Sequence, residues 1–91
     1  MEYAKAQIVH SLAGHDKGDL FCVMDADEVY LLLCDGKRRR TTCPKRKKAK
    51  HVAFAGELQH PALEKIQTGQ EVSDSEIRRA LAAFRAQSRR V

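Results

Sequence analysis

The chain has 91 residues, of which 17 are Lys or Arg and 12 are Asp or Glu, giving a net charge of +5. This length allows one domain with a modest core. The longest apolar run, residues 29–34, is too short to span a bilayer, and residues 1–11 lack a signal-peptide pattern, so we expect a cytoplasmic protein. Its three cysteines form no CxxC pair, which argues against a disulfide framework and a zinc site. We therefore expect no metal and no cofactor.

The basic residues are concentrated in one segment. Residues 37–51 read KRRRTTCPKRKKAKH, in which nine of fifteen residues are Lys or Arg and none is acidic. Eight basic and twelve acidic residues make up the rest, so this segment carries +9 and the remainder −4. Such a segment repels itself unless a polyanion lies against it, and phosphate is the commonest partner. A solvated loop or a localisation signal of the PKRKK kind remains the alternative.

The first part of the chain predicts short strands. Residues 7–12, 20–24, 29–34 and 51–54 are apolar or β-branched runs separated by turn residues. Such strands joined by tight turns predict a mainly β fold, a small antiparallel barrel of four to five strands. The residues that we expect in its core are Ile8, Phe21, Val23, Leu31 and Leu33.

The course of the basic segment follows from its flanking residues. Asp35-Gly36 is a preferred pair for a two-residue hairpin turn, which predicts a return strand over 37–42. Because this strand is basic on both faces, we expect it at an edge of the sheet. Pro44 should end the strand, and residues 45–50 should form a mobile basic loop.

Helical patterns begin after residue 56. Pro61 and Gly69 bracket a short helix over about 61–68. Ser73 and Glu76 have the spacing of a capping box, which predicts a helix over about 74–88. Its apolar stripe should pack on the barrel or on the first helix, and its arginines should form a solvated face whose contact with RNA is left open. The stripe is Ile77, Leu81 and Phe84, and the arginines are Arg78, Arg79, Arg85 and Arg89.

Residues 6–23, AQIVHSLAGHDKGDLFCV, resemble the KOW motif, which is a strand, a glycine-bounded loop and a second strand. The order of later features, DG followed by PKRKKAKH, is similar to small KOW-domain proteins of the large ribosomal subunit. This resemblance covers residues 6–54 and implies an SH3-like (KOW) barrel over 1–55, with 56–91 as a helical extension. It also implies binding of RNA, above all ribosomal RNA. We expect the free protein to be a monomer.

The resemblance and the charge pattern together name the candidate site. The KOW loop comprises Gly14, His15, Asp16 and Gly18. The RNA-binding candidates are Lys17, Lys37, Arg38, Arg39, Arg40, Lys45, Arg46, Lys47, Lys48, Lys50 and His51. The chain departs from the family pattern at Ala6, where a glycine is usual, and at His15 and Asp19, where basic residues are common. Affinity should therefore come mainly from the basic segment, through phosphates of folded RNA. Changing Lys45, Arg46, Lys47 and Lys48 to Ala should weaken RNA binding with little loss of fold.

Other function classes receive less support. The chain offers no nucleophile–base arrangement and no GxxxxGK loop, so we do not expect an enzyme. A KOW module that docks on ribosomal proteins or on the transcription machinery would use an exposed apolar patch instead. A basic tail for nuclear localisation or for duplex-DNA binding is a further alternative, although a localisation signal would need only the PKRKK residues and not the preceding arginines.

Overall fold

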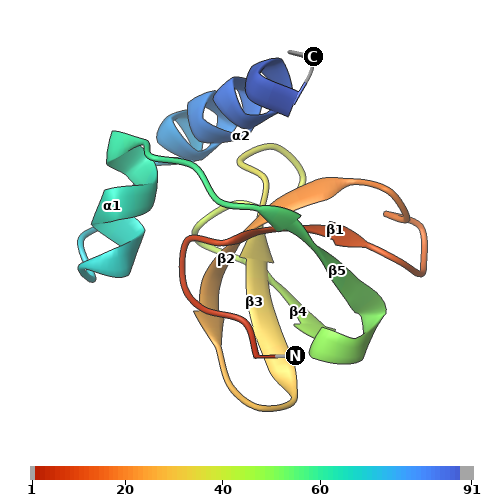
Figure 1. Cartoon of the computed structure of the whole chain (residues 1–91). Coiled ribbons are helices and arrows are strands. Elements are labelled where there is room, and N and C mark those ends of the chain that lie inside the picture. Colours follow the sequence, from red (N-terminus) through yellow and green to blue (C-terminus); the bar gives the residue numbers. More distant parts are fainter. Residues whose placement is uncertain (1, 89–91) are drawn as a thin grey trace.

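The computed structural model describes residues 2–88 of the chain. Five strands come first, with one short 3-10 helix before the last of them, and two α-helices follow (Figure 1). The strands and the 3-10 helix are β1 (Ile8–Ser11), β2 (Leu20–Ala26), β3 (Tyr30–Cys34), β4 (Lys45–Lys48), η1 (Ala49–His51) and β5 (Val52–Gly56). The helices are α1 (Pro61–Gln67) and α2 (Asp74–Ser88).

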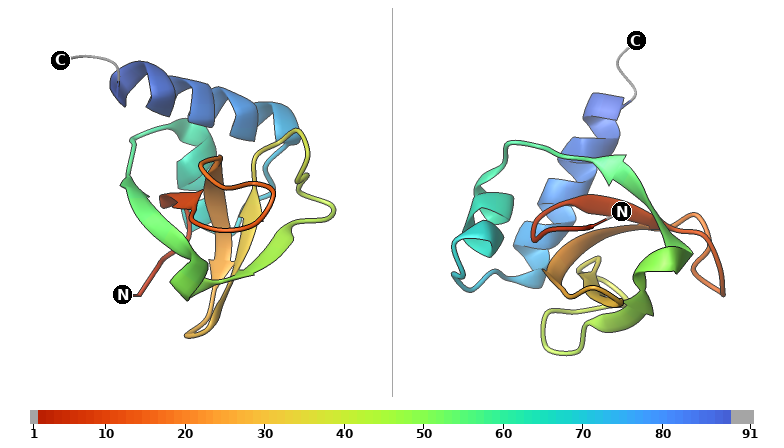
Figure 2. Two further views of the ribbon diagram at one scale, coloured as in Figure 1. Left: turned by 90° about the vertical axis from the view of Figure 1, so that its right-hand side faces the viewer. Right: turned by 60° about the horizontal axis from the view of Figure 1, so that its bottom comes forward.

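All strands belong to one antiparallel sheet in the order β4-β3-β2-β1-β5. The sheet curls strongly, and α1 and α2 lie together against one side of it (Figure 2). This arrangement confirms the mainly β, barrel-like fold with a C-terminal helical segment. The two edge strands differ in character, because β4 is basic and β5 (VAFAG) is apolar.

The sheet buries side chains on both faces. An inner cluster consists of Val9, Phe21, Val23, Leu31, Leu33 and Val52. A helix-facing cluster consists of Ala6, Ile8, Cys22, Cys34, Ala62, Leu63, Ile66, Ile77, Ala80 and Leu81. All five residues predicted for the core are buried, although Ile8 belongs to the helix-facing cluster and the other four to the inner one. Alternation along β2 places Cys22 toward the helices and its two neighbours inside.

The helices begin as the sequence predicts. At α1, the imidazole Nδ1 of His60 accepts a hydrogen bond from the Ala62 amide at 3.1 Å, and Pro61 occupies the first turn. At α2, the hydroxyl of Ser73 accepts from the Glu76 amide and the carboxylate of Glu76 accepts from the Ser73 amide, both at 3.1 Å. This reciprocal pair is the predicted capping box. The stripe of α2 packs on the sheet and on α1, as expected.

The structure corrects the predicted course of the basic segment. Residues 37–42 form no strand, and the strand β4 instead covers Lys45–Lys48, where a mobile loop was expected. Asp35-Gly36 is therefore not a two-residue hairpin turn but the start of a longer connection. The reason is that Pro44 precedes β4 rather than ending a strand, and that Asp35 caps a wider turn through its side chain.

Two further features concern the described part of the chain. No helix within residues 2–88 is long and apolar enough to cross a bilayer. Over the same range, the side chains of His, Cys, Asp and Glu form no group of three that could hold a metal ion.

Candidate nucleic-acid interface

Two loops lie at the same end of the sheet. The glycine loop, residues 12–19, joins β1 to β2, and the basic loop, residues 35–44, joins β3 to β4. Because consecutive strands are antiparallel, both connections leave the sheet at the same end of the strands. A hollow of about 250 Å³ lies between the loops. It is lined by His15, Asp16, Asp19, Phe21, Asp35, Arg38, Arg39 and Lys45.

The glycine loop is closed by its own backbone. Gly14 and Gly18 have φ values of +87° and +89°, a region that residues with a Cβ atom rarely adopt. The Gly18 amide donates to the Ser11 carbonyl at 2.8 Å, and the Asp19 amide donates to the Asp16 carbonyl at 2.9 Å. The glycines thus form the tight turn that the sequence predicts, and they leave His15 and Lys17 exposed at its tip.

Asp16 points inward rather than to the solvent. Its Oδ1 accepts hydrogen bonds from the Ser11 hydroxyl at 2.7 Å and from Lys47 Nζ at 3.0 Å, and its Oδ2 pairs with Lys45 Nζ at 2.7 Å. Lys47 Nζ also donates to the Ala13 carbonyl at 2.8 Å. Burial alone would raise the pKa of Asp16, but the bonds from Lys45, Ser11 and Lys47 hold it well below its usual range. One carboxylate therefore ties the glycine loop to the edge strand β4.

The contacts with Asp16 distinguish Lys45 and Lys47 from the other basic residues of β4. Lys47 is 8% exposed, and its ammonium group is hydrogen-bonded inside the protein. Its side chain therefore holds β4 against the glycine loop. Lys45 is half-buried and paired. Removing both would leave the Asp16 carboxylate buried without a cation, which is costly. These contacts lead us to expect a loss of stability when Lys45 and Lys47 are changed, in contrast to the small loss of fold expected from the sequence for the fourfold change.

The basic loop is held in shape at both ends. Oδ1 of Asp35 accepts from the amides of Lys37 and Arg39, each at 2.9 Å. The Gly36 carbonyl accepts from Arg78 Nη1 of α2 at 2.5 Å, and the Thr41 amide donates to Asp74 Oδ1 at 2.8 Å. The loop is thus docked on the first turns of α2, which Figure 2 shows close to it.

The remaining cations of the segment face outward. Arg46 stacks on the ring of Tyr30, with its guanidinium carbon 3.6 Å from the ring centroid. His51 is half-buried in η1. Seven cations are exposed, and within residues 2–88 they have no ion pair. They are Lys37, Arg38, Arg39, Arg40, Arg46, Lys48 and Lys50.

The structure also brings together residues that sequence reasoning assigned otherwise. Asp16 was expected at a polar loop tip, and only its partners on β4 reveal its anchoring role. Arg78 and Arg85 are exposed, as expected of a solvated face, and both also line a hollow beside the basic loop. Their spacing of seven residues, two helical turns, was the available signal that they share a face. Arg89 lies outside the described residues.

Comparison with known proteins adds no family to this picture. No protein-family model matches the chain, and no curated protein is significantly similar to it. The interface is therefore interpreted from its own chemistry, which is a row of exposed cations on an ordered loop and an edge strand.

Proposed function

We propose that this protein is a non-catalytic RNA-binding protein of the KOW type, associated with the ribosome or similar to a ribosomal protein. The observation that carries the proposal is the set of seven exposed cations without ion pairs within residues 2–88. Cations without an ion pair favour a polyanion, because each neutralised phosphate releases bound counterions.

The chemistry of the surface favours the RNA backbone over the bases. Arginine forks match phosphate oxygens, and Arg38, Arg39 and Arg40 lie together on one loop. The ring of Tyr30 is already covered by Arg46, so it offers no free platform for a stacked base on that face. Recognition by phosphate contacts and by shape suits folded RNA, whose major groove admits few side chains.

The course of the backbone supports the KOW resemblance. A strand, a loop with two glycines at positive φ and a second strand follow one another as in the motif. Ala6, at the position where the family has a glycine, has a φ of +72°. The resemblance supplies the ribosomal context of the proposal, and the charged surface supplies its chemistry.

A salt titration tests the proposal. The probe is a fluorescent RNA hairpin with a stem of about 16 base pairs, compared with the DNA hairpin of the same sequence. With about six phosphate contacts, log K should fall against log salt with a slope near −4 to −5. The double variant R38A/R39A should bind less tightly, with a slope less negative by about 2, because each lost contact removes about one unit.

The matched control removes the same charge elsewhere. The double variant K5A/R79A loses two exposed cations outside the basic segment and should keep the wild-type slope. Equal slopes for both double variants would mean that net charge, not this surface, attracts the RNA. Partners that stay bound in a lysate after RNase treatment and at high salt would instead favour the protein-docking module. Co-sedimentation with ribosomal subunits at two salt concentrations tests the ribosomal part.

A further inference from the structure

A second hollow lies between the basic loop and α2. Its volume is about 310 Å³, which is ample for a phosphate group. It is lined by Asp35, Lys37, Arg78, Ala82 and Arg85. Three cations and one carboxylate therefore surround a space that opens to the solvent, and no residue so far assigned to RNA binding except Lys37 contributes to it.

The helix presents its two arginines on one face. Arg78 and Arg85 are seven residues apart, which is close to two full turns, so their side chains leave α2 in nearly the same direction. Ala82 lies between them and is too small to fill the space. Lys37 closes the hollow from the loop. Among the lining residues only Asp35 opposes these charges, and its Oδ1 already accepts the amides of Lys37 and Arg39.

Arg78 is oriented before any ligand arrives. Its Nη1 donates to the Gly36 carbonyl, which leaves the other N–H donors of the guanidinium group for a ligand. Gly36 permits this contact, because a Cβ atom there would overlap the Asp74 carbonyl oxygen and lie 2.8 Å from Cγ of Arg78. A donor held in place by the fold loses less conformational entropy on binding.

We propose that this hollow binds a backbone phosphate of the RNA, so that α2 is part of the interface rather than only a support for the sheet. The inference rests on the proposed function and extends it to residues of the C-terminal helix. Both hollows are lined by residues of the basic loop, and they share Asp35. An RNA strand that contacts Arg38 and Arg39 can therefore cross the loop and place a further phosphate against Lys37 and Arg85.

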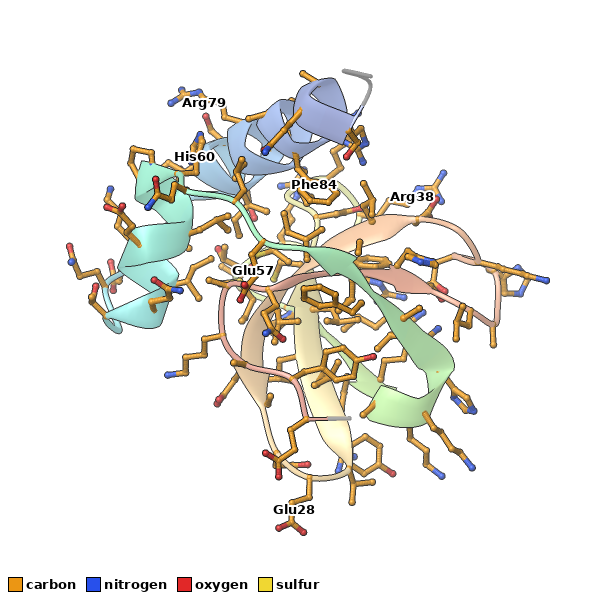
Figure 3. All side chains as sticks on the ribbon, in the orientation of Figure 1. Glu28, Arg38, Glu57, His60, Arg79 and Phe84 are labelled. Atoms are coloured by element: carbon orange, nitrogen blue, oxygen red, sulfur yellow. The ribbon has the colours of Figure 1, made fainter. Side chains whose placement is uncertain are left out.

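The test compares two arginines of the same helix. Arg85 lines the hollow, whereas Arg79 does not, and Figure 3 shows Arg79 on the side of α2 nearer α1, well apart from Arg38. With the RNA hairpin as probe, R85A should bind about three- to tenfold more weakly, with a salt slope less negative by about 1. The control R79A should stay within about twofold of wild type. Arg78 is left unchanged, because its loss would also release the loop from the helix.

A double variant sharpens the result. If Lys37 and Arg85 hold the same phosphate, K37A/R85A should lose less affinity than the two single losses multiplied together. Equal affinities of R85A and R79A would overturn the inference, and if R38A/R39A still weakened binding, the proposed function would stand without it. Failure of the wild-type protein to bind the hairpin would overturn both. Equal unfolding midpoints of R85A and wild type would exclude a fold defect.

Discussion

At the residue scale, Asp16 has the largest structural role of any residue in the glycine loop. A single carboxylate joins Ser11 at the end of β1 to Lys45 and Lys47 on β4. The two lysines pair in register with Leu33 and Leu31, so β4 turns its inward face toward this carboxylate. The ion cluster closes the barrel where β4 has no further strand beside it among those described.

The depressed pKa of Asp16 predicts how stability depends on pH. A carboxyl group with a lowered pKa in the folded state stabilises the fold fully above its unfolded pKa of about 4. That contribution is lost as the pH falls below about 4 toward the folded pKa, because the proton then neutralises the partner of Lys45 and Lys47. We expect D16N to lower the free energy of unfolding by about 3 kcal/mol at pH 7.

Denaturant unfolding between pH 7 and pH 2 measures this effect. The stability curves of D16N and wild type should converge as the medium becomes more acidic. D19N is the control in the same loop, because Asp19 is exposed, and it should change stability by less than about 0.5 kcal/mol at pH 7. A constant gap between D16N and wild type down to pH 2 would contradict the role of the ionised carboxylate.

Ala6 is a second residue whose backbone carries a prediction. Its φ of +72° costs an L-residue about 1–2 kcal/mol, whereas its buried methyl group contributes about 0.8 kcal/mol. A6G should therefore change the free energy of unfolding by less than about 1 kcal/mol. A80G, in the middle of α2 and fully buried, should cost about 2 kcal/mol. Thermal unfolding of both variants would show whether the left-handed conformation at Ala6 is strained, since equal losses would indicate no strain.

At the element scale, apolar and capping patterns predicted most of the fold. The first three strands, the last strand and both helices lie within a few residues of their predicted positions. The strand β4 was missed because KRKK has no alternation of polar and apolar residues, although its side chains alternate in space. The buried ammonium group of Lys47 is paired with the carboxylate of Asp16, which is 31 residues away in the sequence. No local sequence pattern encodes this contact.

Only part of the candidate site could be predicted from the sequence. The composition of residues 37–51 located the cations, but it could not separate those that face the solvent from those that close the barrel. The wide turn at Asp35-Gly36 depends on the docking of Gly36 against Arg78, which is 42 residues distant in the sequence. The cluster of charges is thus visible in the sequence, whereas the fold alone shows which of these cations are exposed and which are paired inside the protein.

The docking of the basic loop on α2 predicts a specific glycine effect. Gly36 has a φ of +79° and its missing Cβ leaves room for α2, so G36A should suffer both backbone strain and a clash. We expect a loss of about 3 kcal/mol in the free energy of unfolding, together with weaker RNA binding as the loop leaves its position. G69A is a matched control, because Gly69 has a φ of +77° with no atom within 4 Å of the added Cβ.

Denaturant unfolding separates the two contributions. G69A should lose only the strain of the left-handed conformation, about 1 kcal/mol, and should bind RNA as the wild type does. The difference between the two variants then measures the contact of the loop with α2. Equal losses for G36A and G69A would mean that the loop tolerates separation from the helix.

At the scale of the whole molecule, the helices and the sheet share one core. The helix-facing cluster combines Ile8, Cys22 and Cys34 from three strands with residues of α1 and α2. Burial raises the pKa of the Cys22 thiol to about 12, with a further contribution from Cys34 beside it, which fits a close-packed apolar setting. A small chain gains from such sharing, because a sheet of this length buries little surface alone. Sheet and helices should therefore unfold together.

A core substitution in α2 tests this cooperativity. Leu81 is 1% exposed and packs in the helix-facing cluster, so L81A should lower the free energy of unfolding by about 3 kcal/mol. Circular dichroism follows the helices. Tyrosine fluorescence follows the sheet, because Tyr30 lies on β3 and Tyr3 packs against the inner cluster. Both signals should shift to the same lower midpoint, since the loss of the helix exposes one face of the sheet. If the tyrosine midpoint stayed at its wild-type value while the helical signal moved, the barrel would be stable without α2. The contacts of α2 with the basic loop could then be released without unfolding the sheet.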